Sequence, residues 1–126
     1  MIIVTPILRI FDYSKAVEFY VDWLGFNIDW EHALGSSSPR YIQISRGDLI
    51  LHLTEHHNDC SPGARIHIEN FEGLAEYHRL LIARNYKYIS PGIGRAFWDK
   101  AVIKMDVIDP FRSILTLTEN KTYKEI

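Results

Sequence analysis

The stretch Gly47-Asp-Leu-Ile-Leu-His-Leu-Thr-Glu-His-His57 lies near the middle of the sequence and ends in three polar residues. Gly47-Asp48 indicates a turn, and the alternation after it indicates a strand, because successive strand residues point to opposite faces. One face is apolar and is expected in the core: Leu49, Leu51 and Leu53. The other face holds Ile50, His52 and Thr54. We therefore expect His52 to lie where a ligand or a metal could meet it.

The residues before this stretch predict a strand, a helix and further strands. We expect a strand over Ile2–Ile10 with Pro6 at its edge or start. A helix follows over residues 16–24, where apolar residues recur at helical spacing, and either Asp12 or Ser14 can cap it. This half of the chain is therefore expected to begin as β-α.

Two more strands are expected between that helix and Gly47. Phe26, Ile28 and Trp30 alternate with polar residues, which indicates a strand and predicts that Trp30 lies in the core with the other two. A turn rich in Gly and Ser covers residues 34–39, and a further strand covers residues 41–44. The first half of the chain is thus expected to be a βαβββ module.

The second half repeats this pattern with almost no residue identity. Asn58–Gly63 is rich in turn-forming residues and indicates a linker. Beyond it we predict a strand at 65–69, a helix at 71–86, a turn or flexible loop at 91–94 and strands at 101–107 and 114–118. The sequence therefore predicts one domain over residues 1–126, with modules at about 1–57 and 64–119 and a polar tail at 120–126.

Composition narrows the possible partners. The chain of 126 residues is 47% hydrophobic and 24% charged, with a net charge of −2, which argues against a nucleic acid partner. The single Cys60 cannot form an internal disulfide, so a cytoplasmic location is expected. We find no signal peptide and no apolar run of about 18 residues, and we therefore expect no membrane partner.

Several short motifs, in order along the chain, resemble one known family. Its opening is similar to Leu8-Arg9-Ile10-Phe11-Asp12, Ala16-Val17-Glu18-Phe19-Tyr20 and Leu24-Gly25-Phe26, and its close to Asp109-Pro110-Phe111 with Leu115-Thr116-Leu117-Thr118-Glu119. This is the glyoxalase/bleomycin resistance family of the vicinal oxygen chelate superfamily. Asp29-Trp30-Glu31-His32, Ser45-Arg46-Gly47 and Leu51-His52-Leu53 resemble its bleomycin-resistance branch.

The resemblance implies a fold and a function. The fold is α+β, with two βαβββ modules that form an open, curved mixed sheet with a cleft and helices on the outer face. The function is metal-independent binding, in which a homodimer sequesters a small molecule, such as a cationic glycopeptide antibiotic of the bleomycin type, without catalytic residues. Two alternatives stay open: a metal-dependent lyase, transferase or dioxygenase of the same superfamily, and an interaction module without a small ligand.

The family's four metal positions can be matched to this sequence one at a time. The resemblance assigns them to Thr5, to His52, to either Arg65 or His67, and to Thr116. Hydroxyl groups are poor ligands for a divalent transition metal. No cofactor is therefore expected. Under the enzyme alternative, a weak metal site would use His52 and His67 with Glu69.

The expected ligand contacts come from four parts of the chain. Phe97 and Trp98 follow a Gly-rich loop, and Trp98 is expected either to contact the ligand or to seal the dimer interface. Acidic and polar groups suited to a cationic ligand are expected at Glu31 and His32, and Thr116 joins His52 in the cleft.

Two expectations concern turns. Asp106 and Asp109 are interpreted as turn-forming residues. Arg112-Ser113 replaces the Gly-Asn that is usual in the family, and because arginine disfavours left-handed backbone, we predict a different turn geometry there.

Overall fold

The computed structural model describes residues 1–33, 35 and 37–121 and divides the chain into two compact units. The first unit comprises residues 1–64 together with Asp109–Ser113, and the second comprises Arg65–Ile108 and the residues that follow 113. Each unit carries one four-stranded mixed sheet, so the predicted α+β class and the two-module organisation are confirmed. No helix within the described residues is long and apolar enough to cross a membrane.

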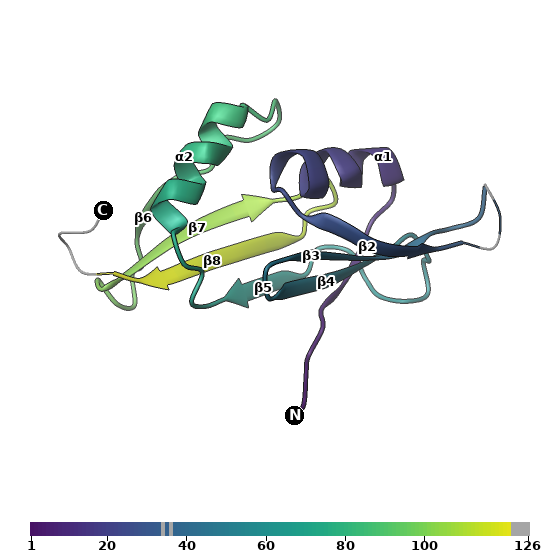
Figure 1. The fold of residues 1–126 in the computed structure, drawn as a ribbon, viewed down its shortest axis with the longest axis horizontal. Helices are drawn as coiled ribbons and strands as arrows, with labels where there is room; N and C mark the ends of the chain where they lie inside the picture. Colours follow the sequence, from purple (N-terminus) through teal and green to yellow (C-terminus); the bar gives the residue numbers. More distant parts are fainter. Residues whose placement is uncertain (34, 36, 122–126) are drawn as a thin grey trace. The chain divides into compact units, whose positions relative to one another are not determined.

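The first unit contains four strands and one continuous helical segment. Its elements are β1 (Ile7–Arg9), α1 (Tyr13–Ala16), η1 (Val17–Trp23), β2 (Asn27–His32), β3 (Tyr41–Arg46) and β4 (Leu49–Thr54). The strand order is β1-β4-β3-β2, with β1 parallel to β4 and the other neighbours antiparallel. Figure 1 shows α1 and η1 on one face of this sheet.

The helical segment of the first unit packs its aromatic residues into the core. Asp12 is the cap, since its Oδ1 accepts from the amide of Lys15 at 3.0 Å. Phe19 and Tyr20 are fully buried, with ring centroids 4.8 Å apart. They meet the apolar side of the sheet, whose buried members are Leu8, Ile42, Ile44, Leu51 and Leu53. The opposite face of the sheet is therefore left for polar residues.

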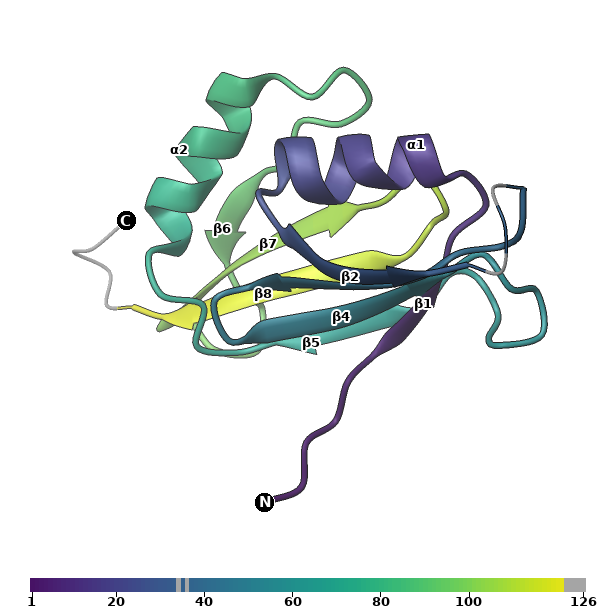
Figure 2. The same ribbon diagram turned by 45° about the vertical axis from the view of Figure 1, so that its right-hand side comes forward.

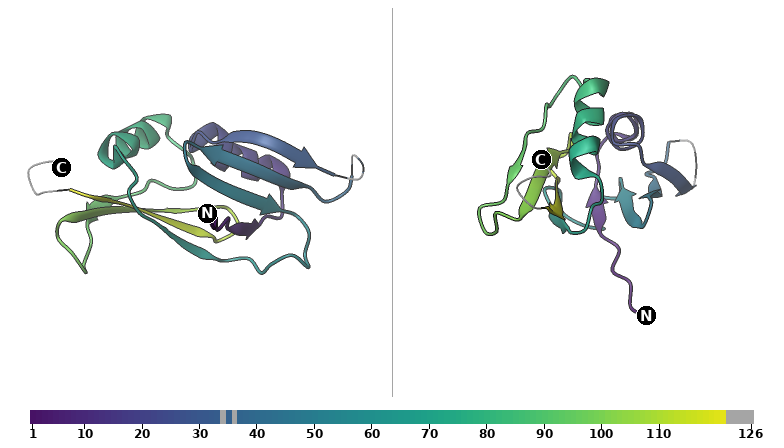
Figure 3. Two further views of the ribbon diagram at one scale, coloured as in Figure 1. Left: turned by 60° about the horizontal axis from the view of Figure 1, so that its bottom comes forward. Right: turned by 60° about the vertical axis from the view of Figure 1, so that its left-hand side comes forward.

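The first strand is shorter than the sequence predicts. Only Ile7–Arg9 pairs with β4, so the strand predicted over Ile2–Ile10 is wrong in its N-terminal part. Residues 1–4 are exposed and run away from their sheet (Figure 3). Their apolar character gives the pattern of a strand, but Pro6 has no N–H to donate, and the pairing with β4 begins only after it.

The second unit repeats the topology of the first. Its elements are β5 (Arg65–Ile68), α2 (Leu74–Arg84), β6 (Ile93–Arg95), β7 (Val102–Ile108) and β8 (Ile114–Asn120), with strand order β5-β8-β7-β6. Figure 2 shows α2 crossing one face of this sheet. The turn or flexible loop predicted at 91–94 is wrong in part, because residues 93–95 pair with β7. Gly92 and Gly94 are unfavourable in strands, so the sequence does not indicate a strand here. Pairing with β7 stabilises β6 instead.

One short stretch is nearly identical in the two units. Leu51-His-Leu-Thr-Glu55 and Leu115-Thr-Leu-Thr-Glu119 share four of five residues, and each lies along the strand that pairs with the first strand of its unit. Within this pattern Thr116 occupies in β8 the place that His52 occupies in β4. The two residues are therefore equivalent positions of the repeat.

The turn between β7 and β8 keeps a left-handed residue. Asp109 accepts hydrogen bonds from the amides of Phe111 and Ser113, both at 2.8 Å, and from the hydroxyl of Tyr20 at 2.7 Å. Asp109 is therefore a turn former, as expected. Arg112 has a φ of +73°. The expectation that arginine would avoid left-handed backbone here is wrong, because the Asp109 contacts and the 2.9 Å backbone hydrogen bond from Asp109 to Ser113 hold the turn closed.

The tail predicted at 120–126 lies only partly within the described residues. Asn120 ends β8 and Lys121 follows it. Residues 122–126 lie outside the described part of the chain.

Candidate functional site

His52 lies on the face of the first sheet opposite the core, between residues of two neighbouring strands. Its Nδ1 is 2.8 Å from the Tyr41 hydroxyl, and its Nε2 is 2.9 Å from Oε1 of Gln43. Gln43 is its direct partner across the β3–β4 pair. Both ring nitrogens are thus occupied within the first unit.

Tyr41 and Gln43 were not found from the sequence, although the signal for them was present. A two-residue turn at Gly47-Asp48 pairs Arg46 with Leu49, and counting back along both strands brings Gln43 opposite His52. Burial, followed by the charges of Asp59 and Cys60, raises the pKa of Tyr41 above its usual range. The Tyr41 phenol is therefore neutral and available as a hydrogen-bond donor.

Trp30 joins this face, and its predicted place in the core is wrong. Its side chain is 44% exposed, its ring stacks on Tyr41 with centroids 6.0 Å apart, and it meets His52 edge-on at 5.4 Å. The reason is a β-bulge, since the pairing with β3 shifts register between Ile28 and Trp30. One extra residue reverses the alternation of the strand, which sequence periodicity cannot reveal.

Asp29 is the extra residue of the bulge, and its carboxylate is held by the same face. Oδ2 accepts from Nε2 of Gln43 at 3.0 Å, and Oδ1 accepts from the hydroxyl of Ser45 at 2.9 Å. A chain of hydrogen bonds therefore runs from Tyr41 through His52 and Gln43 to Asp29. We refer to Trp30, Tyr41, Gln43 and His52 as the His52 face.

In the second unit, Thr116 is tied to a charged cluster. Its hydroxyl donates to Oδ1 of Asp106 at 2.6 Å, and Nε of Arg65 lies 3.3 Å from it. Oδ2 of Asp106 also accepts from Nζ of Lys104 at 3.0 Å and from Arg65 at 3.3 Å. Asp106 is therefore no turn former. It lies inside β7, opposite Thr116, and no local pattern in the sequence indicates that pairing.

Neighbouring charges keep Asp106 ionised. Burial acts to raise its pKa, but hydrogen bonds from Thr116 and Lys104 and the positive charges of Lys104 and Arg65 outweigh that effect, so the pKa is lowered. The Thr116 hydroxyl therefore donates its hydrogen to the Asp106 carboxylate, and its oxygen accepts from Nε of Arg65.

The aromatic pair of the second unit lies near His67. Phe97 is 92% exposed and Trp98 46% exposed, and their rings meet edge-on at 5.1 Å. Trp98 also lies 5.7 Å from the ring of His67, whose Nε2 is 3.8 Å from Oε1 of Glu69. The structure thus brings Phe97, Trp98 and His67 together within one unit.

The remaining predicted contacts lie at the end of β2. Glu31 pairs with Arg40, at 3.8 Å between Oε1 and Nη1, and His32 is exposed opposite Tyr41. Glu31 is therefore engaged with an arginine rather than with His52.

The donor chemistry at the four family positions does not fit a transition metal. The His52 nitrogens are both hydrogen-bonded, and the Thr116 hydroxyl donates a hydrogen bond to Asp106. Across residues 1–33, 35 and 37–121, no group of three or more His, Cys, Asp or Glu side chains could hold a metal ion.

Comparison with known proteins gives one family and several similar structures. The sequence model of the family described as "Glyoxalase superfamily protein" matches residues 2–124 of this chain. A search of curated proteins finds no match.

Three solved structures illustrate the likeness in fold. A bleomycin-binding protein complexed with bleomycin is 22% identical over 96% of this chain and 100% of its own, with a TM-score of 0.68. A bleomycin resistance determinant encoded on the transposon Tn5 is 23% identical over 97% and 100%, with a TM-score of 0.70. TnmS3, an antibiotic binding protein from a Streptomyces species, is 19% identical over 95% and 98%, with a TM-score of 0.64.

Proposed function

The chain belongs to the glyoxalase superfamily, and we propose that within it this protein binds a small molecule in the cleft of a homodimer, without a metal and without converting the ligand. The observation that carries the proposal is the state of His52. Its two ring nitrogens face Tyr41 and Gln43, so the histidine serves a polar, aromatic surface rather than a metal ion.

The equivalent position of the second unit supports the same conclusion. A metal-dependent member needs about three nitrogen or carboxylate ligands around an open site. Thr116 offers a hydroxyl that donates to Asp106, and Thr5 is a second hydroxyl at a family position. Neither residue type is suited to bind a divalent transition metal.

Exposed aromatic rings provide the binding surface in this proposal. Trp30 and Trp98 are each about half exposed, and Phe97 is almost fully exposed. Such rings supply apolar contact area, while a few placed polar groups set orientation. His52 and Thr116 are the proposed polar contacts, and Glu31 and His32 would meet the ligand from the end of β2.

An apolar N-terminal arm supports the homodimer. Residues 1–4 read Met-Ile-Ile-Val, and their exposed fractions run from 70% to 109%. Four consecutive exposed apolar side chains are costly in water and are best explained by burial against a second copy. Replacing Ile2 and Ile3 by serine should shift the protein from dimer to monomer, as measured by light scattering.

A single Cys60 without a partner supports a cytoplasmic location.

Similar proteins guide the choice of ligand. Structures of similar fold are described as binding bleomycin or another antibiotic. A glycopeptide antibiotic of the bleomycin type is therefore the first ligand to test. It is cationic, and Asp29, which accepts a hydrogen bond from Gln43, is an acidic residue beside the His52 face.

The experiment is a thermal shift series with metal-free bleomycin, followed by calorimetric titration. We expect a saturable rise in Tm, a stoichiometry of integral sites per dimer and recovery of unchanged ligand. Trp98→Ala should weaken binding about tenfold, or by about 1.4 kcal/mol, whereas exposed Leu80→Ala on α2 should leave it unchanged. The absence of saturable binding would exclude bleomycin as the ligand.

One observation favours the enzyme alternative, namely the proximity of His67 and Glu69 at 3.8 Å. A metal-dependent lyase, transferase or dioxygenase would bind Fe, Mn, Ni or Zn through these two residues and His52. Elemental analysis of protein purified without chelator distinguishes the two functions. A full equivalent of one such metal, lost in His52→Ala and in His67→Ala, would replace the binding proposal.

A further inference from the structure

Two positive groups of the second unit converge on a single oxygen atom. Nη2 of Arg65 lies 3.3 Å from Oδ2 of Asp106, and Nζ of Lys104 lies 3.0 Å from the same oxygen. Arg65 belongs to β5 and Lys104 to β7, the two strands on either side of β8. We refer to Arg65, Lys104, Asp106 and Thr116 as the Asp106 cluster.

The Asp106 cluster has one positive charge in excess. Asp106 is ionised, since burial acts to raise its pKa but the hydrogen bonds from Thr116 and Lys104 and the nearby positive charges outweigh that effect. Its carboxylate therefore offsets one of the two cations. Glu69, just beyond the end of β5, has a side chain 76% exposed and lies 3.8 Å from His67. A ligand with a single negative charge would balance the cluster.

Both cations keep donors that the cluster does not use. An ammonium group has three N–H donors and a guanidinium group has five. In the part of the chain that the structure describes, Nζ of Lys104 donates to Asp106 alone, and Arg65 donates through Nε and Nη2. Nη1 of Arg65 is left for a ligand, as are further donors of Lys104. Because both cations contact one oxygen of Asp106, a second carboxylate beside it can reach both.

An aromatic side chain borders the cluster. Cross-strand pairing places His67, Thr116 and Asp106 in one row across β5, β8 and β7. Directly paired residues of neighbouring strands lie on the same face of a sheet. The ring of Trp98 lies 5.7 Å from that of His67, and Trp98 is 46% exposed. A flat ring attached to the carboxylate therefore has a packing partner at the His67 end of the row.

A glycine leaves space beside Lys104. Gly94 of β6 pairs with Lys104, so both lie on the same face of the sheet. A Cβ atom at Gly94 would meet no atom of the described chain within 4 Å, apart from its neighbours in sequence. A ligand can therefore approach Lys104 from the β6 side without displacing a side chain.

We propose that the second unit binds an aromatic monocarboxylate, with the carboxylate bridging Arg65 and Lys104 and the ring packed against Trp98. This ligand class rests on the proposed function, because Trp98 and Thr116 belong to the same ligand surface, but it does not require bleomycin as the ligand. A phosphate dianion would exceed the excess charge and would be repelled by Asp106. A neutral ring would forgo the charge-assisted hydrogen bonds.

The test is an NMR titration of the whole chain with benzoate, phenylacetate and 1-naphthoate. Matched analogues of each separate the contributions: for benzoate, benzamide lacks the charge, cyclohexanecarboxylate lacks the aromatic ring, and phenyl phosphate carries a second charge. We expect saturable shifts at Arg65, Lys104 and Trp98 with at least one aromatic carboxylate. Its amide should bind at least tenfold more weakly, and the other two analogues should also bind more weakly.

Variants of the two cations test their part in binding. Arg65→Gln and Lys104→Gln should each weaken binding of the aromatic carboxylate about tenfold and leave binding of its amide unchanged. Arg79→Gln is the matched control, because it removes one positive charge from an exposed position on α2 and should not alter binding. Gly94→Val fills the space beside Lys104 without a change of charge and should also weaken binding. Unchanged amide shifts along α2 would show that the second unit is folded.

The outcomes distinguish this ligand class from the proposed function. Equal binding of an aromatic carboxylate and its amide would overturn the proposal, as would tighter binding of phenyl phosphate than of benzoate. Failure of every aromatic carboxylate to bind would refute it, and saturable binding of metal-free bleomycin in the same titration would leave the proposed function in place. Binding of an aromatic carboxylate without binding of bleomycin would support the proposal and exclude bleomycin alone.

Discussion

The Tyr41 hydroxyl and Nδ1 of His52 lie 2.8 Å apart across β3 and β4, and their neighbours fix which atom holds the proton. The amide nitrogen of Gln43 donates to Oδ2 of Asp29. Oε1 of Gln43 then faces His52 and accepts from its Nε2. The neutral imidazole therefore carries its proton on Nε2 and accepts from Tyr41.

The first prediction concerns this tautomer. Long-range ¹H–¹⁵N correlation spectra at neutral pH should show His52 as the Nε2–H form. In Gln43→Leu, which removes the acceptor, the population of the Nδ1–H form should rise. Exposed His32 provides the control, and its pattern should not change. A dominant Nδ1–H form in the parent protein would contradict the hydrogen-bond direction assigned between Tyr41 and His52.

The second prediction separates an exposed tryptophan from a buried one. Trp23 is 3% exposed in the core of the first unit, and Trp30 lies on the His52 face. Trp23→Ala should lower the free energy of unfolding by about 3–5 kcal/mol. Trp30→Ala should lower it by about 1 kcal/mol, the value of one aromatic contact. Urea denaturation measures both free energies. Similar losses in the two variants would show that Trp30 is buried in the core.

Trp30 also shows where sequence reasoning reaches its limit. Periodicity correctly indicated a strand from Phe26 onwards, and one of the two cap candidates, Asp12 rather than Ser14, is the cap because local chemistry determines it. A bulge changes the face of every later residue, yet it depends on pairing between β2 and β3. The family and the α+β class were therefore predictable, whereas the face on which Trp30 lies was not.

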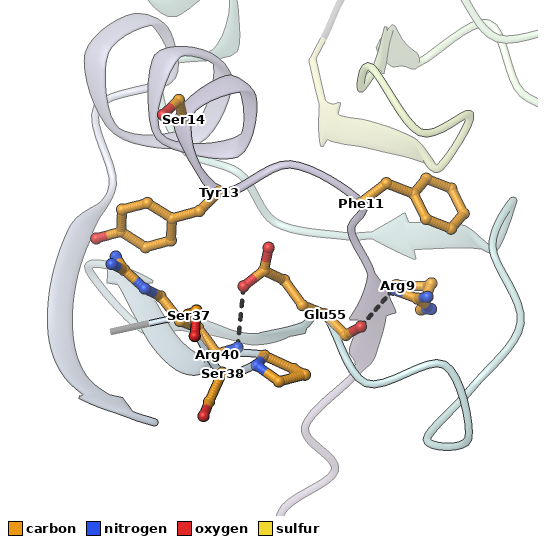
Figure 4. Close-up of a pocket in the computed structure, with 9 residues that line it drawn as sticks. Arg9, Phe11, Tyr13, Ser14, Ser37, Ser38, Arg40 and Glu55 are labelled. Carbon is orange, nitrogen blue, oxygen red and sulfur yellow. Dashed lines mark hydrogen bonds between the residues drawn. The ribbon is translucent and has the colours of Figure 1, made fainter. Parts of the chain in front are cut away.

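Some residues of the candidate sites were also predictable and others were not. The alternation of the strand places His52 on its face, and counting residues back from the turn at Gly47 places Gln43 opposite it. The role of Asp106 depends on Arg65, which is distant in the sequence, and on a register that no local pattern records. A pocket of the first unit lined by Arg9, Tyr13, Arg40 and Glu55 (Figure 4) is built from four segments of the chain, so no single motif indicates it.

The third prediction concerns the left-handed Arg112. A non-glycine residue at a φ of +73° is strained by its Cβ, and glycine removes that strain at some cost in unfolded-state entropy. Arg112→Gly should therefore raise the free energy of unfolding by about 0.5–1 kcal/mol. Arg112→Ala keeps the Cβ and should give no gain. A loss of stability in Arg112→Gly would show that the arginine side chain contributes more than its backbone costs.

The fourth prediction is a pH dependence from Asp106. Its pKa in the folded protein is lowered below the ordinary value of 3.8, so its contribution to stability is complete above that pH and is lost as the pH falls through the folded pKa. Asp106→Asn should therefore be less stable than the parent at neutral pH, and the difference should shrink below about pH 4.

Asp109 does not disturb that comparison. Burial raises the pKa of Asp109, so its effect on stability has the opposite sign, but it is common to both proteins. The measurement is the difference in denaturation free energy between parent and variant across the acid range. A difference that stays constant with pH would mean that Asp106 contributes to stability through packing and not through its charge.

The fifth prediction concerns Glu119, whose role as a helix cap the sequence did not reveal. Its two carboxylate oxygens accept from the amides of Gly73 and Leu74, at 3.1 and 3.0 Å, at the start of α2. These amides have no partner within the helix, and a negative charge near them also favours the helix dipole. Glu119→Ala should lower the free energy of unfolding by about 1–2 kcal/mol.

Glu119→Gln is the matched control, because it keeps one acceptor oxygen and removes the charge. Its loss should be smaller than that of Glu119→Ala, and the gap between parent and Glu119→Gln should narrow at high salt. Hydrogen exchange provides a local readout, since protection should fall first at Leu74 and the residues of the first turn of α2. Equal losses in both variants, with no change in exchange at Leu74, would show that Glu119 acts through packing in β8 and not through the helix.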